Sequence, residues 1–263
     1  MYSYDELFFE YLRTGSARSA RAVLPHVVGP LGIRSVLDVG CGAGAWLAEY
    51  LRLGVADVVG VDGDYVDRSV LMVDAKCFVP GDIAQPFDFR KTYDLVQCLE
   101  VAEHVPAESG GTLVDNIVRH GSKVLFSAAV PGQGGEHHVN EQPYEFWRDR
   151  FLERGYRLFD FVRPAIRGEA AVEPWYRYNL LFFAHDRVID SLPDAVARCR
   201  VPDDSPIKDY SPPAYRLRKS ILRLLPNQVV SWLAVLKHKL AVRTRVPPKR
   251  DSLAPSRRDP GHR

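Results

Sequence analysis

Short apolar runs alternate with longer amphipathic stretches along most of the chain. The apolar runs, bounded by turn residues, predict buried strands at 35–39, 57–61, 75–79, 93–99, 122–128, 156–162 and 178–184. Stretches with apolar residues three or four positions apart predict helices at 4–13, 17–28, 46–53, 108–119 and 143–154. Strands that alternate with helices are typical of an α/β fold with a mostly parallel sheet covered on both faces, and we expect the last two strands to pair antiparallel.

The chain of 263 residues is 46% hydrophobic, which is enough for one full α/β core and an appendage. The patterns divide it into N-terminal helices (1–30), a sheet domain (31–186), a linker rich in Pro and Asp (187–213), a basic amphipathic helical segment (214–246) and a tail that we expect to be disordered (247–263).

Charge is distributed unevenly along the chain. The net charge is +2, yet positions 211–263 hold 13 Lys or Arg against two Asp, which leaves a net −9 on positions 1–210. An acidic body with a basic end indicates a catalytic domain with a separate contact segment. Segment 214–246 could contact an anionic membrane surface, a protein partner or a second subunit, or nucleic acid, or it could simply pack as a helical pair with a solvated basic face.

The four cysteines are spaced neither as a CxxC metal site nor as a disulfide framework, which favours a reducing compartment. The N-terminal residues do not resemble a signal peptide, and no apolar run is long enough for a membrane span. We therefore expect a cytoplasmic protein, with segment 214–246 as a candidate for peripheral contact with the inner membrane surface.

A glycine turn directly follows the first predicted strand, and acids stand at three strand ends. Gly40, Gly42 and Gly44 allow a tight turn and a close approach to a ligand. Asp38, inside the strand end, would repel a pyrophosphate but attract the ammonium group of a methionine moiety. Asp62 ends the next strand, where an acid accepts ribose hydroxyls. After the third strand, Asp82 can accept the adenine amino group while Ile83 packs on the ring.

Four segments, VLDVGCGAG (36–44), VGVDGD (59–64), GDIAQPF (81–87) and YDLVQCLEVAEHV (93–105), resemble those of the class I S-adenosylmethionine-dependent methyltransferases, in particular the UbiE/UbiG-like group of small-molecule enzymes. The resemblance covers roughly residues 30–185. It implies a Rossmann-like fold with a seven-stranded sheet whose last hairpin is reversed, and S-adenosylmethionine as cofactor. The resemblance implies that Asp62 binds the ribose and that Asp82 and Ile83 bind the adenine. It implies backbone contacts near the sulfonium from Cys98 and Leu99. The residues that it implies for the methionine part are Asp38, Gly40, Gly42 and Gly44.

Two loops after the fourth and fifth strands carry the candidate chemistry. The first holds Glu100, Glu103 and His104, and the second, 130–142, holds His137 and His138. Because these strands are neighbours in such a fold, both loops open onto one mouth. In one interpretation His138 or His104 is the general base that takes the proton of an acceptor hydroxyl, with Glu103 and His137 as further catalytic candidates.

In the other interpretation Glu100, Glu103, His104 and His138 (or its neighbour His137) bind a divalent cation such as Mg²⁺ or Mn²⁺, which would lower the pKa of the acceptor hydroxyl. The E-x-x-E-H pattern followed by a later His resembles the Hen1-type small-RNA 2′-O-methyltransferases. The plainer alternative is that His104 shapes the cofactor pocket and that Glu141 is an acid at a helix start.

The sequence therefore predicts O-methylation of a small molecule, such as a sugar or glycan precursor or a secondary metabolite. Metal-assisted 2′-O-methylation of RNA is the second hypothesis, although we do not expect a nucleic-acid partner. A non-catalytic protein that keeps the cofactor fold and binds a membrane or partner through its basic segment is the third. Nothing in the sequence defines the oligomeric state.

Overall fold

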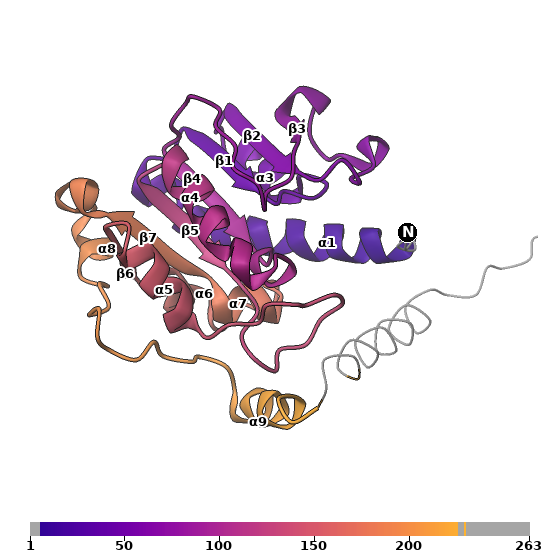
Figure 1. The fold of residues 1–263 in the computed structure, drawn as a ribbon. Coiled ribbons are helices and arrows are strands. Elements are labelled where there is room, and N and C mark those ends of the chain that lie inside the picture. Colours follow the sequence, from indigo (N-terminus) through magenta and orange to yellow (C-terminus); the bar gives the residue numbers. More distant parts are fainter. Residues whose placement is uncertain (1–5, 226–228, 230–263) are drawn as a thin grey trace, which may run out of the picture.

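The computed structural model describes residues 6–225 and 229, which form three layers with a seven-stranded sheet in the middle (Figure 1). The strand order is β3-β2-β1-β4-β5-β7-β6, and only β7 runs antiparallel to its neighbours. The strands are β1 (Ser35–Val39), β2 (Asp57–Asp62), β3 (Phe78–Pro80), β4 (Leu95–Leu99), β5 (Lys123–Ser127), β6 (Tyr156–Phe159) and β7 (Leu181–His185). The predicted mostly parallel sheet with a reversed final hairpin is confirmed.

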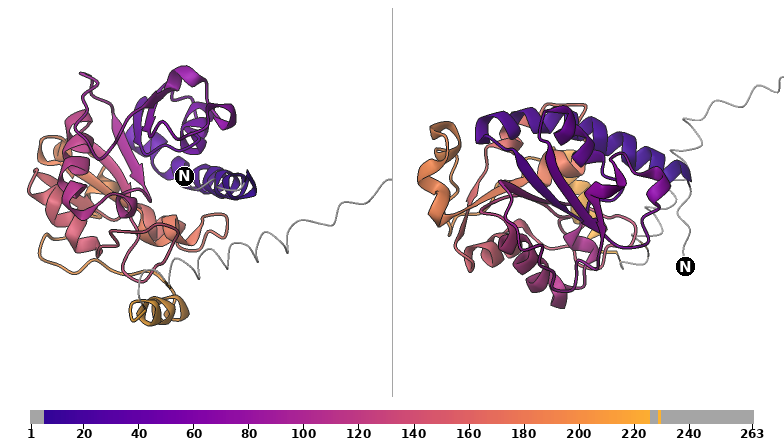
Figure 2. Two further views of the ribbon diagram at one scale, coloured as in Figure 1. Left: turned by 45° about the vertical axis from the view of Figure 1, so that its right-hand side comes forward. Right: turned by 90° about the horizontal axis from the view of Figure 1, so that it is seen from above.

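Helices cover both faces of the sheet, as the two further views show (Figure 2). One layer contains α1 (Glu6–Val23), α3 (Ala45–Arg52), α6 (Val162–Ile166) and α7 (Pro174–Asn179), and the other contains α4 (Gly110–His120) and α5 (Tyr144–Leu152). Side chains of each strand alternate between the two layers, so that Val36 packs in one core and Leu37 in the other. The buried strands read as continuous apolar runs for this reason.

Short elements complete the described chain. They are the α-helices α2 (Val28–Leu31), α8 (Asp194–Ala197) and α9 (Pro213–Leu222), and the 3-10 helices η1 (Leu24–His26), η2 (Arg68–Val70), η3 (Ala75–Cys77), η4 (Ala102–His104), η5 (Ala107–Ser109) and η6 (Asp186–Ser191). No helix among residues 6–225 is long and apolar enough to cross a membrane.

The N-terminal helix differs from the prediction of two helices at 4–13 and 17–28. A single helix, α1, runs through Gly15 to Val23. Gly15 is a site of close packing rather than a break, because a Cβ there would lie 3.1 Å from a carboxylate oxygen of Glu173. The hydroxyl of Ser19 donates to the carbonyl of Gly15 and accepts from the backbone N–H of Glu173, so tertiary contacts hold the helix together at this point.

The predictions for the last two strands were too long, and residues 75–77 of the predicted third strand form the 3-10 helix η3. Val162 begins helix α6, and Tyr178 belongs to α7, so that β7 starts only at Leu181. The guanidinium of Arg163, which is fully buried, explains the first boundary: it binds both carboxylate oxygens of Asp160 and the carbonyl of Tyr178. These long-range contacts override the strand propensity of the apolar residues around them.

Segment 187–213 is packed rather than a free linker, which corrects the prediction from its composition. It pairs with the edge strand β6, where Val201 donates its backbone N–H to the carbonyl of Leu158, and it buries Ile207 in the core. Of the predicted helical segment 214–246, the described part forms α9 and the turn after it. The rest of that segment, apart from residue 229, and the predicted tail 247–263 lie outside the described residues.

Candidate active site

The turn between β1 and α3 has the backbone of a ligand cradle. Gly40, Gly42 and Gly44 have φ values of 82°, 53° and 77°, in the left-handed region that favours glycine. A Cβ on Gly40 would lie 2.4 Å from a methyl carbon of Val101, whereas a Cβ on Gly42 would meet no atom within 4 Å. Gly40 is thus required by packing, and Gly42 faces open space that a ligand could fill.

Asp62, at the end of β2, ties this turn to the neighbouring strand. Its Oδ2 accepts the backbone N–H of Gly42 at 2.7 Å. Its Oδ1 accepts the backbone N–H of Gly63 at 2.7 Å and the hydroxyl of Tyr65 at 2.6 Å. The carboxylate is only 5% exposed, yet it binds a hydroxyl, which is the interaction that a ribose requires.

Asp38 lies beneath the same turn and is 3% exposed. Burial raises the pKa of Asp38 to about 7, Gln97 on the paired strand β4 opposes the shift, and the charge of Asp62 adds to it. A buried carboxylate of this kind is stabilised in its ionised form by a positive ligand group. The surroundings of Asp38 and Asp62 therefore fit the ammonium and ribose ends of S-adenosylmethionine.

The remaining predicted cofactor residues stand at the ends of β3 and β4. Asp82 is exposed, and its Oδ1 accepts the backbone N–H of Ala84, while Ile83 is half-buried. The side chains of Cys98 and Leu99 pack in the two opposite cores, which leaves their backbone as the only part that could face a cofactor. Their roles toward adenine and the sulfonium stay predictions.

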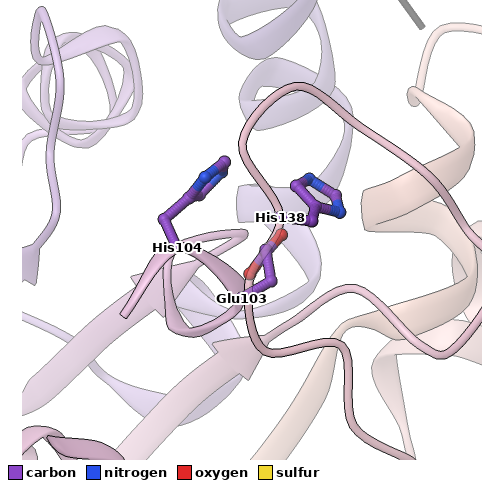
Figure 3. Close-up of side chains that lie close together, drawn as sticks. All are labelled: Glu103, His104 and His138. Carbon is purple, nitrogen blue, oxygen red and sulfur yellow. The ribbon is translucent and has the colours of Figure 1, made fainter. Parts of the chain in front are cut away.

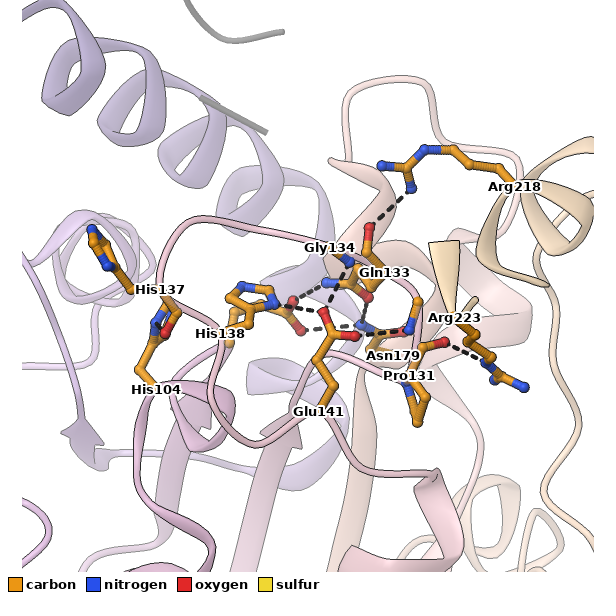
Figure 4. Close-up of polar contacts among 12 residues, drawn as sticks. His104, Pro131, Gln133, Gly134, His137, His138, Glu141, Asn179, Arg218 and Arg223 are labelled. Carbon is orange, nitrogen blue, oxygen red and sulfur yellow. Dashed lines mark hydrogen bonds and ion pairs between the residues drawn. The ribbon is translucent and has the colours of Figure 1, made fainter. Parts of the chain in front are cut away.

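The loop between β5 and α5 holds an oriented histidine. Nδ1 of His138 lies 2.8 Å from Oε1 of Glu141, whose carboxylate also accepts the backbone N–H groups of Gly132 and Gly134, each at 2.8 Å (Figure 4). Burial acts to raise the pKa of Glu141, but the hydrogen bonds from His138 and the two glycines outweigh it and lower the pKa. Glu141 is therefore an ionised partner that fixes the ring of His138.

Sequence reasoning missed this role and treated Glu141 as an acid at a helix start. The available signal was its position three residues after His138 in a loop rich in glycine. Such a spacing permits the contact but does not require it, because the backbone of Gly132, at φ 80°, and of Gly134, at φ 70°, must first turn both N–H groups toward the carboxylate.

The two loops meet, and they bring Glu103, His104 and His138 together (Figure 3). One potential ligand atom from each of the three lies within 4.8 Å of the others. Glu103 is 1% exposed, and one of its carboxylate oxygens has no hydrogen-bond partner among the described residues. Burial, and then the charge of Glu100, raise the pKa of Glu103 well above its ordinary value.

His104 is neutral at physiological pH. Although His104 is an exposed residue, loss of hydration of its ring and then the neighbouring His138 lower the pKa of His104 to about 4. The rings of the two histidines meet edge to face, with their centroids 4.9 Å apart. A neutral imidazole can accept a proton or bind a metal ion.

Glu100 and His137 lie outside this cluster. Glu100 has a φ of 55°, rare for a residue with a side chain, and its carboxylate accepts the side-chain amides of Gln133 at 2.8 Å and of Asn179 at 3.3 Å. The side chain of His137 is exposed, and its carbonyl oxygen lies 3.3 Å from Nδ1 of His104 (Figure 4). The structure thus groups three of the four predicted metal ligands.

A cavity of about 260 Å³ lies between this loop and the end of α9. His138 and Glu141 line it on the loop side, and Leu222 and Leu225 line it on the side of α9. His138 therefore borders both the cavity and the three-residue cluster.

A mostly parallel sheet with a glycine turn after its first strand and acids at the carboxyl ends of its first two strands defines the Rossmann-like class of cofactor-binding folds. Within that class, a family model described as "Methyltransferase domain" matches residues 7–160. The chain belongs to this methyltransferase family, which confirms the family predicted from the four motifs.

Curated relatives carry the name ubiquinone biosynthesis O-methyltransferase. The one from Pseudomonas savastanoi pv. phaseolicola is 34% identical over 157 residues, which cover 51% of this chain and 61% of the relative. The one from Bradyrhizobium diazoefficiens is 39% identical over 84 residues, which cover 28% of this chain and 31% of the relative. The chain thus matches less than two thirds of the length of either relative.

Among solved structures, the sugar N-methyltransferase KedS8 from a Streptoalloteichus species is similar with a TM-score of 0.50 and 17% identity, covering 70% of this chain and 96% of that one. The magnesium protoporphyrin IX methyltransferase of Synechocystis, with bound S-adenosylhomocysteine, has a TM-score of 0.47 and 17% identity, covering 71% and 90%. At 17% identity the likeness to KedS8 concerns the fold alone.

Proposed function

We propose that this chain transfers a methyl group from S-adenosylmethionine to a hydroxyl of a small molecule, with a sugar or glycan precursor or a phenolic secondary metabolite as the acceptor class. The observation that carries the proposal is the hydrogen bond between His138 and Glu141 beside the cavity. The name of the curated relatives, O-methyltransferases, supports the choice of oxygen as the methylated atom.

The residues of the glycine turn fit the cofactor. When bound, S-adenosylmethionine supplies a methyl group already activated on a sulfonium. Asp38 would hold its ammonium group, the backbone at Gly42 would lie against its methionine part, and Asp62 would accept ribose hydroxyls in place of Tyr65. Asp82 and Ile83 would hold the adenine. These contacts place the methyl donor in one orientation, and alignment of that kind contributes a large share of the rate of a displacement reaction.

His138 is the proposed general base. The ionised carboxylate of Glu141 can only accept a hydrogen bond, so Nδ1 of His138 must donate it. The neutral ring of His138 therefore carries its proton on Nδ1, and Nε2 has no proton. Nε2 can then take the proton of the acceptor hydroxyl as the new C–O bond forms. Glu141 stabilises the positive charge that the ring acquires, as a carboxylate does in hydrolase triads.

The size of the cavity supports a small acceptor. Its volume of about 260 Å³ lies just below the range of roughly 300–1,000 Å³ that is usual for small-molecule sites. The lining combines the polar groups of His138 and Glu141 with the apolar Leu222 and Leu225. That mixture is suited to a compact molecule with a hydroxyl on one side and an apolar face on the other.

Two measurements test this proposal. Calorimetric titration of S-adenosylhomocysteine should give micromolar binding to the wild type and to His138→Ala alike. Methyl transfer from labelled cofactor to a panel of sugars and phenols should be about 100-fold or more slower in His138→Ala. Absence of cofactor binding in the wild type would overturn the enzyme class, and full activity of His138→Ala would remove the histidine from the mechanism.

A divalent cation is a second candidate, favoured by the unpartnered oxygen of Glu103 within reach of His104 and His138. Mn²⁺ or Mg²⁺ there would bind the acceptor oxygen and lower the pKa of its hydroxyl. Calorimetric titration of Mn²⁺ into the wild type, Glu103→Gln and Glu100→Gln tests this site without an activity assay. A heat lost in Glu103→Gln but kept in Glu100→Gln would support it, and no heat in the wild type, alone or with S-adenosylhomocysteine, would contradict it.

We also propose a cytoplasmic location. All four cysteines are free thiols in the structure, and Cys41 and Cys98 are buried. Free thiols in a chain of this size support a reducing compartment. Labelling with a thiol reagent under denaturing conditions, on protein taken directly from cells, should modify all four cysteines, and any disulfide would contradict this location.

A further inference from the structure

The outer face of α9 carries an apolar stripe that no described residue covers. Leu217, Ile221 and Leu224 are 63%, 54% and 85% exposed. They are spaced four and three positions apart, so they form one line along the helix and the turn that follows it. A helix at the surface of a globular protein normally turns such a stripe inward, and an exposed one marks an interaction site.

The opposite, polar face of α9 is the one that holds the helix in place. Arg218 donates to the carbonyl of Gln133 at 2.9 Å, and Arg223 donates to the carbonyl of Pro131 at 2.7 Å (Figure 4). Lys219 is only 4% exposed, and its Nζ lies 2.7 Å from Oδ2 of Asp209. Rotating the helix to bury its stripe would break this half-buried ion pair, which is costly because it would leave the buried ammonium of Lys219 without its partner.

Charge along the same part of the chain indicates what the stripe contacts. Residues 211–225 contain four Lys or Arg and no acid, and positions 211–263 carry a net +11 against −9 on positions 1–210. The sequence after α9, VVSWLAVLKHKL (229–240), also combines aliphatic residues and a Trp with two lysines. Aliphatic side chains flanked by cations match acyl chains beneath anionic headgroups.

We propose that the outer face of α9 docks on an anionic lipid bilayer, with Leu217, Ile221 and Leu224 entering the interface. Arg216, which is exposed and precedes this stripe in the helix, would contact phosphate groups. The acidic body would be repelled by the same surface, so the molecule would dock through this end alone. Because α9 also binds the loop that carries His138, the docked surface lies next to the proposed active site. Only this last point rests on the proposed function.

Flotation of the full chain with vesicles tests the docking without an activity assay. We expect the wild type to bind vesicles of equal parts phosphatidylcholine and phosphatidylglycerol but not vesicles of phosphatidylcholine alone. Binding should weaken with salt, because headgroup attraction is screened. The double variant Leu217→Glu with Ile221→Glu should bind at least about tenfold more weakly, since charged side chains are costly in an apolar interface. The matched control is Leu51→Glu on α3, 38% exposed and away from this helix.

Several results would overturn the proposal. One is a wild type that does not float with anionic vesicles, and another is a double variant that binds as well as the Leu51→Glu control. Binding of single-stranded RNA that both variants retain, without vesicle binding, would assign the basic charge to nucleic acid instead. A wild-type dimer in size-exclusion chromatography that the double variant loses, without vesicle binding, would make the stripe an interface between copies. Leu224→Glu alone, at 85% exposure, serves as a second variant if the double variant does not fold.

Discussion

Nδ1 of His138 and Oε1 of Glu141 lie 2.8 Å apart, and the carboxylate that forms this contact is itself held by two backbone N–H groups. The orientation of the ring is therefore set by the loop rather than by a bound molecule. A base that is oriented before its substrate arrives loses less entropy when the reaction occurs. This relationship distinguishes His138 from His104, whose Nδ1 contacts only the carbonyl oxygen of His137 at 3.3 Å.

We expect Glu141→Gln to slow methyl transfer by about 10- to 100-fold while the affinity for S-adenosylhomocysteine stays unchanged. The amide keeps the shape of the side chain but loses the charge that fixes the protonated nitrogen of His138. Steady-state kinetics should show the loss in kcat. Glu136→Gln in the same loop is the matched control and should keep its kcat. Equal rates in the two variants would show that Glu141 does not orient the base.

Gly42 and Gly54 form a natural pair of positions for testing the cofactor cradle. Both have positive φ, 53° and 88°, and at both an added Cβ would meet no atom within 4 Å. Alanine should therefore destabilise the fold at either position by a similar amount, about 1 kcal/mol, from backbone strain. Only the Cβ at Gly42 would enter the space assigned to the methionine part of the cofactor.

We accordingly expect Gly42→Ala to bind S-adenosylhomocysteine at least about tenfold more weakly, which corresponds to 1.4 kcal/mol or more, and Gly54→Ala to bind like the wild type. Thermal melts measure the strain, and calorimetry measures the affinity. Equal affinities for the two variants would mean that the cofactor does not lie against Gly42.

The raised pKa of Asp38 predicts a pH dependence of cofactor binding. With a pKa of about 7, caused by burial, the carboxyl group is mostly protonated at about pH 6 and mostly ionised at about pH 8. Only the ionised form attracts an ammonium group, and the apparent affinity falls with the fraction in that form. The affinity for S-adenosylhomocysteine should therefore rise about tenfold over this range, with release of a proton on binding near neutral pH.

Titration in buffers of different ionisation enthalpy measures that proton release. In Asp38→Asn the affinity should be lower at every pH and no proton should be released near pH 7. The raised pKa of Asp38 also affects folding. Burial makes the ionised carboxylate less stable in the folded protein than in the unfolded chain, so its contribution to the free energy of unfolding falls as the pH rises through about 7. A wild-type affinity that is flat with pH would remove Asp38 from the ammonium site.

Much of this fold, including the glycine turn after β1, could be predicted from the sequence because the signals are local. Val36 and Leu37 belong to one apolar run, and the glycines that follow need a turn wherever they stand. The distance from Gly40 to Asp62 reflects one helix and one strand, which have characteristic lengths. For that reason, local sequence was sufficient to predict the glycine turn and the acid at the end of β2.

The pairing of His138 with Glu141 and the packing of segment 187–213 could not be read in the same way. The packing of segment 187–213 depends on contacts between residues far apart in the chain, such as Val201 with Leu158. The pairing of His138 with Glu141 depends on backbone turns at Gly132 and Gly134, which the residue types permit but do not require. The composition of segment 187–213 is polar and rich in proline, which predicts a linker. Composition cannot show that the edge strand β6 has N–H and C=O groups with which this segment can form hydrogen bonds. The position of Glu100 outside the three-residue cluster is a further case, since its partners come from two other elements.

The contact between α9 and the loop that carries His138 gives the last prediction. The backbone of Gly132 has a φ of 80°, and a Cβ there would lie 2.2 Å from the carbonyl oxygen of Lys219 in α9. Gly132→Ala must therefore displace the helix or the loop, and the loop N–H at this position is one of the two that hold Glu141. We expect slower methyl transfer, unchanged affinity for S-adenosylhomocysteine and faster hydrogen exchange of the amides of α9. Gly54→Ala, with similar backbone strain in open space, should change none of these. If Gly132→Ala behaves like Gly54→Ala in both exchange and turnover, α9 does not brace the loop, and the basic segment has no influence on the site through this contact.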